Sequence, residues 1–300
     1  MIENVKLKTT FRRPLLRSGA LRPAALLAVS AFLGLASGCM QFQEEWIILP
    51  DGSGKMVIRV AVDLETLRKS EKFGVNPKDL EKQLSFSDLA FDKAELGNGF
   101  VAMAKPRIEK KDGWRIMTIT AYYEDINKVT FGRAGDSSKI KFSFKKEGEG
   151  YLLEVDENLF SDAKLDGLDK VEDVPEEQAE AAWEMVKDFT VGFELARSVK
   201  MPGAVTSVDG YASKTGRIAI NKLTESDLQG LKDIAKAGKI AKPGKRKVVC
   251  GKSEVSEADL AAFKEELEDA KAAWPKIQAE LKAEAEKKKK DSEKDQKKDE

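Results

Sequence analysis

The chain has 300 residues with 52 basic and 52 acidic side chains, no histidine and two cysteines. A chain without histidine lacks the commonest general base and metal ligand, which excludes His-dependent triads, zincin motifs and most zinc or copper sites. Its balanced charge argues against nucleic acid as a partner, since nucleic-acid binders are usually basic. We therefore expect no metal, no cofactor and no histidine-based active site.

Residues 1–38 have the pattern of a secretory signal peptide. Six basic residues precede an apolar run that begins at Pro23 and leads into Leu35-Ala36-Ser37-Gly38-Cys39. A basic start, an apolar stretch too short to span a bilayer and small residues at the cleavage site define this class of segment. We expect cleavage between Gly38 and Cys39, which leaves 46 basic and 51 acidic residues and a net charge of −5.

The end of this segment resembles the bacterial lipobox, in which the cysteine is acylated with fatty acids such as palmitate and becomes the new N-terminus. The resemblance implies that Cys39 is the lipidation site and that the protein is anchored on the exported side of the cell membrane or the outer membrane. Ala36 stands where the motif usually has leucine. An ordinary signal peptide, with Cys39 as a bystander, is the alternative.

Two features bear on the route and the membrane. The Arg12-Arg13 pair leaves both the general secretory and the twin-arginine routes open. Met40, next to the cysteine, is not the aspartate associated with retention in the inner membrane, which favours the outer membrane.

Alternating apolar residues and turn clusters predict β-hairpins in the first half of the mature chain. Residues 42–49 and 56–62 flank a turn at Pro50-Asp51-Gly52-Ser53-Gly54. Further hairpins are predicted from 100–108 with 114–123, and from 139–145 with 151–155, while residues 63–72 and a segment from Asn76 are expected to be short helices. Hairpins joined by short loops predict an α+β fold, with an antiparallel sheet and helices on one face.

The second half alternates helices, strands and charged loops. Residues 162–177 are acidic and loop-like, and a possible internal boundary lies there; Pro175 then opens a helix to about residue 187. Strands are predicted at 189–199, 216–221 and 248–250, with a helix capped by Thr224 or Ser226 between the last two. A basic run before the last strand is predicted to be a turn that contacts anionic lipid headgroups, or else a solvated turn: Lys242, Lys245, Arg246 and Lys247.

Residues 253–282 carry the clearest helix. Ser256 with Asp259 approximates a capping box. Apolar residues then recur in steps of three and four, which is the spacing of a coiled-coil seam: Leu260, Phe263, Leu267, Ala270, Trp274, Ile277 and Leu281. Self-association through this seam and packing on the chain's own domain both remain open, and Pro275 predicts a kink. The charged tail at 283–300 is expected to be disordered or a frayed helix.

No motif predicts a catalytic residue. Ser143 to Lys146 and Lys214-Thr215-Gly216 match short motifs of penicillin-binding enzymes, but the helix and the third motif that these need are missing. Gly251-Lys252-Ser253 lacks the first glycine of a phosphate-binding loop, because Arg246 stands in its place. Adjacent carboxylates such as Glu44 and Glu45 point to opposite faces of a strand.

Two regions resemble the LppM-like domain of bacterial lipoproteins. The first runs from Cys39 through Leu49-Pro50-Asp51-Gly52-Ser53-Gly54 to the strand at 56–62, and the second includes Met201-Pro202-Gly203 and the strand near Ile218. The resemblance spans about residues 39–221 and implies an α+β envelope domain without established catalysis that engages lipids or glycolipids. Members often add a C-terminal membrane segment, whereas this chain ends in a charged helix.

The sequence thus predicts a cleaved segment 1–38, an α+β domain at 39–252, an amphipathic helix at 253–282 and a charged tail. The expected function is a non-catalytic binding or structural role in the envelope, with lipid or an envelope protein as the partner. The alternatives are a periplasmic enzyme that uses two carboxylates and an assembly subunit that oligomerises through the C-terminal helix. Cys250 has no partner within the chain if Cys39 carries lipid, so it is expected to be a lone, half-buried thiol or else a link to another chain.

Overall fold

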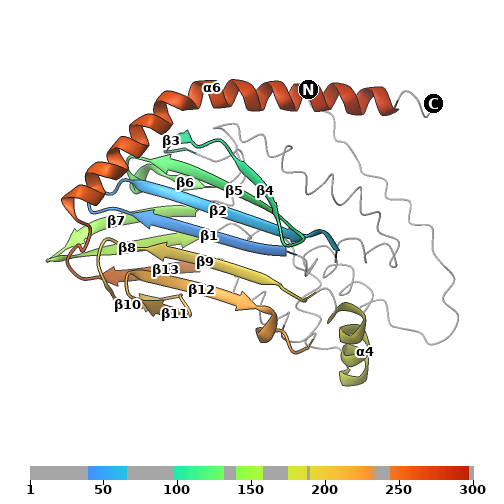
Figure 1. Cartoon of the computed structure of the whole chain (residues 1–300). Coiled ribbons are helices and arrows are strands. Elements are labelled where there is room, and N and C mark those ends of the chain that lie inside the picture. Colours follow the sequence, from blue (N-terminus) through green and yellow to red (C-terminus); the bar gives the residue numbers. More distant parts are fainter. Residues whose placement is uncertain are drawn as a thin grey trace, which may run out of the picture.

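The computed structural model describes residues 40–65, 98–131, 140–157, 175–187, 190–230, 233 and 244–296. Within these residues the chain forms two β-sheets that pack against each other, with one long helix across the edge of the larger sheet (Figure 1). The predicted helices at 63–72 and from Asn76 lie almost wholly outside the described residues, as does most of the 162–177 segment.

The larger sheet is built around its two longest strands. Its order is β11-β12-β9-β1-β2-β5-β3, with β4 also paired to β5. The strands are β1 (Met40–Ile48), β2 (Gly54–Asp63), β3 (Phe100–Met103), β4 (Arg107–Lys111), β5 (Trp114–Tyr123), β9 (Glu194–Lys200), β11 (Ser213–Thr215) and β12 (Ile218–Thr224). All pairs are antiparallel except β1 with β9, which is parallel. Strand β1 is therefore a central strand that is paired on both sides.

The smaller sheet is antiparallel throughout and has the order β10-β13-β8-β7-β6. Its strands are β6 (Thr130–Phe131), β7 (Ile140–Glu147), β8 (Gly150–Glu157), β10 (Val205–Asp209) and β13 (Gly244–Cys250). The short helix η2 (Ile126–Lys128) links β5 to β6, so the chain passes from one sheet to the other there. Two further helices, α4 (Glu176–Val186) and η4 (Glu225–Asp227), stand at the start of β9 and the end of β12.

The core lies between the sheets because apolar residues alternate along the strands of both. From the larger sheet, Trp46, Met56 and Ile119 contribute to it, and from the smaller sheet Phe142 and Leu153 do so. The rings of Trp46 and Phe142 meet across the interface with centroids 4.5 Å apart. Each fully buried side chain of this size contributes roughly 1.5–3 kcal/mol through removal of apolar surface from water.

The long helix α6 (Glu257–Gln296) packs on its own domain. Asp259 N donates to Ser256 Oγ at 3.0 Å, and Ser256 N donates to the Asp259 carboxylate at 3.4 Å, which confirms the predicted capping box. The seam joins the main core: Phe263, Leu267 and Trp274 are buried, and Leu260, Ala270, Ile277 and Leu281 pack against it half-buried. In the structure the seam packs on the chain's own domain, which was one of the two expectations for it.

Helix α6 continues through Pro275 and to Gln296, so the backbone of residues 283–296 is helical. Figure 1 shows that the helix changes direction part-way along its length. Pro275 is the residue inside it that lacks a backbone donor and crowds the preceding turn, so we attribute the bend to this proline.

Ion pairs tie α6 to the sheet below it. The Glu266 carboxylate accepts from Lys55 Nζ at 2.7 Å and from the Tyr122 hydroxyl at 2.8 Å. Burial would raise the pKa of Glu266, but these two hydrogen bonds outweigh it, so the pKa lies below its usual 4.5. Burial first, and then the hydrogen bond to Glu266, raise the pKa of Tyr122, so the phenol stays protonated.

The α+β class, with mostly antiparallel sheets and a C-terminal helix, is confirmed. The hairpins at β1–β2 and β7–β8 are those predicted, and β3 and β4 both pair with β5 as expected for residues 100–108. The strands divide between two sheets, where one was expected. The division follows from non-local pairings that turn signals do not encode: β9 joins β1 in the larger sheet, and β13 joins β8 in the smaller one.

Truncation of Trp274 tests the packing of α6. Trp274→Ala removes a large side chain from the core and should lower the free energy of unfolding by about 3–5 kcal/mol in urea titrations. Gln278→Ala, at an exposed position of the same helix, is the control and should cost little. A Trp274→Ala chain that keeps its stability but changes its oligomeric state in sedimentation would show that the seam joins two chains.

The depressed pKa of Glu266 gives stability a defined pH dependence. Its contribution is present above the unfolded value near 4.5 and is lost as pH falls through the lower folded value. Glu266→Gln should therefore destabilise the chain at neutral pH, and its stability should converge with that of wild type as pH falls through the lowered pKa of Glu266 and the wild-type carboxyl becomes protonated. Glu265→Gln, on the exposed side, is the matched control, and a loss that stays the same at every pH would contradict the assignment.

Candidate functional site

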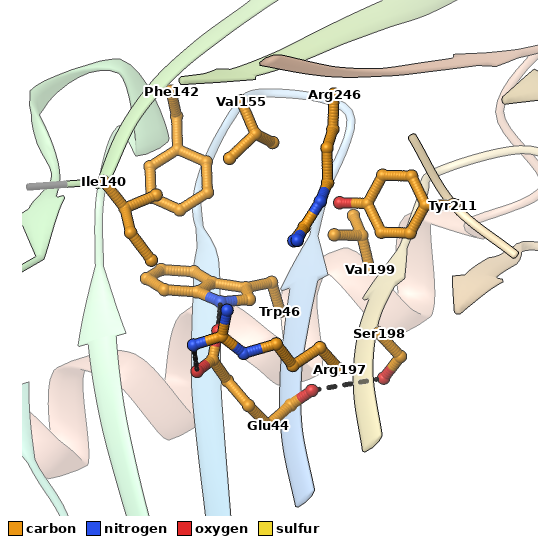
Figure 2. A pocket seen from close by; sticks show the side chains of 10 residues that line it. All are labelled: Glu44, Trp46, Ile140, Phe142, Val155, Arg197, Ser198, Val199, Tyr211 and Arg246. Carbon is orange, nitrogen blue, oxygen red and sulfur yellow. Dashed lines mark hydrogen bonds and ion pairs between the residues drawn. The ribbon is translucent and has the colours of Figure 1, made fainter. Parts of the chain in front are cut away.

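A small cavity between the two sheets gathers most of the buried charge in the described part of the chain (Figure 2). Strands β1 and β9 supply one wall, strands β7, β8 and β13 the other, and Tyr211 closes one side. Ten residues line it: Glu44, Trp46, Ile140, Phe142, Val155, Arg197, Ser198, Val199, Tyr211 and Arg246.

Glu44 is the centre of the cluster and is only 5% exposed. Trp46 Nε1 donates to Glu44 Oε1 at 2.7 Å, and Arg197 Nη2 lies 3.6 Å from Glu44 Oε2. The parallel register of β1 and β9 pairs Glu44 with Arg197, so both side chains leave the sheet on the same face. A buried carboxylate is tolerated only when it is paired and hydrogen-bonded, and both conditions hold here.

Arg246 enters the same cavity from β13. It is 8% exposed, and its guanidinium carbon lies 5.7 Å from the centroid of the Tyr211 ring, within range of a cation–π interaction. This corrects the expectation that Arg246 contacts the membrane surface. The basic run from Gly244 belongs to strand β13 and is not a turn, so its side chains alternate: Arg246 points inward while Lys245 and Lys247 are exposed.

The cavity is too small for a lipid chain. Its volume is about 20 Å³, room for about one water molecule, whereas ligand pockets are typically ~300 Å³ or larger. The face of the larger sheet that carries Trp46 is covered here by the smaller sheet. In this conformation the cluster holds the two sheets together and does not form a ligand pocket.

The arrangement also does not form an acid–base pair. Glu44 is the single carboxylate that lines the cavity, and its oxygens are used by Trp46 and Arg197. General acid–base chemistry on two carboxylates needs a second group facing the same space. Among the residues that the structure describes, no group of three or more cysteine, aspartate or glutamate side chains is placed to hold a metal ion.

The remaining predicted site residues do not belong to this cluster. Gly38, Cys39 and Lys242 lie outside the described residues. Cys250 is buried and free in β13, where burial raises the pKa of its thiol and so lowers its reactivity at neutral pH. None of the helices described is both long and apolar enough to cross a membrane.

Sequence reasoning missed Glu44, Arg197 and Tyr211 as parts of one site. The pairing of β1 with β9 joins residues more than 150 positions apart, which no local pattern reveals. One signal was available for Glu44, since it stands two positions from Trp46 on a strand and so shares its face.

The described elements define an α+β protein with two mostly antiparallel sheets and a C-terminal helix. No protein-family model matches the chain, and no curated protein matches it. Among solved structures it is similar to the NMR structure of the folded domain of LppM from Mycobacterium tuberculosis, with 12% sequence identity over 74% of this chain and 93% of that chain. The TM-score is 0.29, so the structural resemblance is weak.

The Glu44–Arg197 pair makes a prediction for stability. Arg197→Met leaves the Glu44 carboxylate buried without that cation and should lower the free energy of unfolding by about 3–5 kcal/mol. The double variant Glu44→Gln/Arg197→Met removes both charges and should recover part of that loss in urea titrations. Glu45→Gln, on the other face of β1, is the control, and additive losses in the double variant would contradict a buried ion pair.

Proposed function

We propose that the chain is a lipid-anchored protein of the bacterial envelope with a non-catalytic binding or structural role. One observation carries this proposal. The signal-peptide pattern of residues 1–38 leads directly to Cys39, and strand β1 starts at the next residue, Met40. A predicted cleavage site directly ahead of a paired strand supports cleavage at that place.

The position of β1 in the sheet adds to this argument. Because β1 pairs along its length with β2 and β9, it is held firmly from its first residues onward. No linker separates Cys39 from that strand, so acyl chains on Cys39 would hold the domain within about 10 Å of the bilayer surface at ~3.3 Å per residue. Two or three acyl chains together give stable anchoring, whereas one gives only marginal binding.

The charge cluster supports a non-catalytic role. The oxygens of the buried Glu44 carboxylate are committed to Trp46 and Arg197, and the cavity around them has room for about one water molecule. The partner we propose is therefore met on the outer surface of the domain, as a lipid or another envelope component. The seam of α6 is used within the chain, so assembly through that seam is not part of the proposal.

Loss of the acylated cysteine tests the proposal. In a bacterium with lipoprotein processing, we expect wild type in the membrane fraction and Cys39→Ser in the soluble fraction, because the variant has no site for the thioether-linked lipid. Cys250→Ser removes the other cysteine and should stay with the membrane. Equal membrane association of wild type and Cys39→Ser would contradict lipid anchoring.

A further inference from the structure

Three segments far apart in the sequence meet at one end of the larger sheet. The end consists of the start of β1, the turn between β4 and β5 at Asp112 and Gly113, and the loop at 190–193 that leads into β9. Register proves that they share one end: Met40 pairs with Val62, Asp63 pairs with Trp114, and Gln41 pairs with Glu194 (Figure 1). We call it the anchor end.

Direct contacts hold these three segments together. Gln41 Nε2 donates to the carbonyl of Gly192 at 3.3 Å, and Leu64 N donates to the carbonyl of Gly113 at 3.1 Å. Gly192 has φ +75°, and a Cβ placed on it would lie 3.1 Å from the Trp114 ring, so the loop is seated against that ring. The loop is therefore fixed within two residues of the point where Cys39 joins the fold.

Val191 in the loop of the anchor end and Ile108 on the adjoining edge strand β4 are exposed apolar side chains. Val191 is 54% exposed and Ile108 is 52% exposed, and in the part of the chain that the structure describes these are the large hydrophobic residues classed as exposed. Val191 precedes Gly192 in the loop, and Ile108 lies on β4 with its partner Met117 three residues from Trp114. Single exposed apolar residues are common on protein surfaces, but here both flank the one point from which the lipid would leave the fold.

We infer that the anchor end is a bilayer-docking surface on which Val191 and Ile108 enter the headgroup region beside the lipid of Cys39. This rests on the proposed function, since the acyl chains bring this end to the membrane. Trp114 lies half-buried against Gly192, the residue after Val191, and aromatic residues of this kind are enriched at membrane interfaces. Lys110 and Lys111 are exposed beside the same turn, and their long apolar stems can cover apolar surface while the charged ends stay in water.

The docking is apolar and not electrostatic. Charges at this end and along β4 nearly balance, with five basic side chains against six acidic ones: Arg107, Lys110, Lys111, Arg115 and Lys222 against Asp63, Glu65, Glu109, Asp112, Glu194 and Glu225. Helix α4 adds further glutamates near the same loop. Docking thus needs no anionic lipid and persists at high salt, where headgroup attraction is screened.

The test uses the full processed chain in phosphatidylcholine vesicles that contain brominated lipid. A single new cysteine, Val191→Cys, carries an environment-sensitive fluorophore, while Cys250 is buried and an otherwise wild-type chain reports its background labelling. The control is Glu149→Cys, at the exposed turn between β7 and β8 at the opposite end of the molecule (Figure 1). We expect blue-shifted, quenched emission at position 191 and unshifted, unquenched emission at position 149.

The possible outcomes distinguish the docking surface from the lipid anchor on which it rests. Equal, unquenched emission at both positions in a chain whose intact mass shows an acylated Cys39 would overturn the docking surface and leave the lipid anchor standing. A chain that is not acylated would overturn both. Quenching at position 191 that disappears at high salt, or that requires anionic lipid, would overturn the apolar mode of docking.

Discussion

The pairing of β1 on both sides is the constraint on which the rest of the structure depends. Antiparallel pairing with β2 follows from a tight turn, and parallel pairing with β9 brings a distant part of the chain alongside. The alternation of β1 then turns Trp46 and Glu44 toward the smaller sheet, and Glu45 away from it. A single strand thus sets the face of the core, the partner of the buried carboxylate and the place where the leader joins the fold.

Polar groups buried between the sheets give this arrangement specificity at some cost in stability. Glu44, Arg197 and Arg246 lie among aromatic and aliphatic side chains, so a shifted register would leave a charge without its partner. Helix α6 completes the fold from outside, with an apolar seam toward the core and ion pairs such as Lys55–Glu266 at its border. The exposed faces of the domain, and not its interior, are then left for contacts with other molecules.

Local chemistry made much of this predictable. The turn at 50–54 predicted the β1–β2 hairpin, the alternating runs at 139–145 and 151–155 predicted the β7–β8 hairpin, and the spacing from Leu260 to Leu281 predicted the buried side of α6. The pairing of β1 with β9 was not predictable, because no local pattern in the sequence of β1 indicates which distant strand lies beside it. Arg246 shows the consequence: in a turn its charge would be solvated, but as an inward position of a strand it is buried.

The central claim is that the folded domain begins at a lipid-bearing cysteine, so that its central strand is fixed at the bilayer. The most direct measurement is the intact mass of the wild-type chain extracted from bacterial membranes. The account predicts a chain that lacks residues 1–38 and carries the added mass of acyl groups on Cys39. An unmodified chain, or one cut at another residue, would contradict the anchor and the orientation of the domain that depends on it.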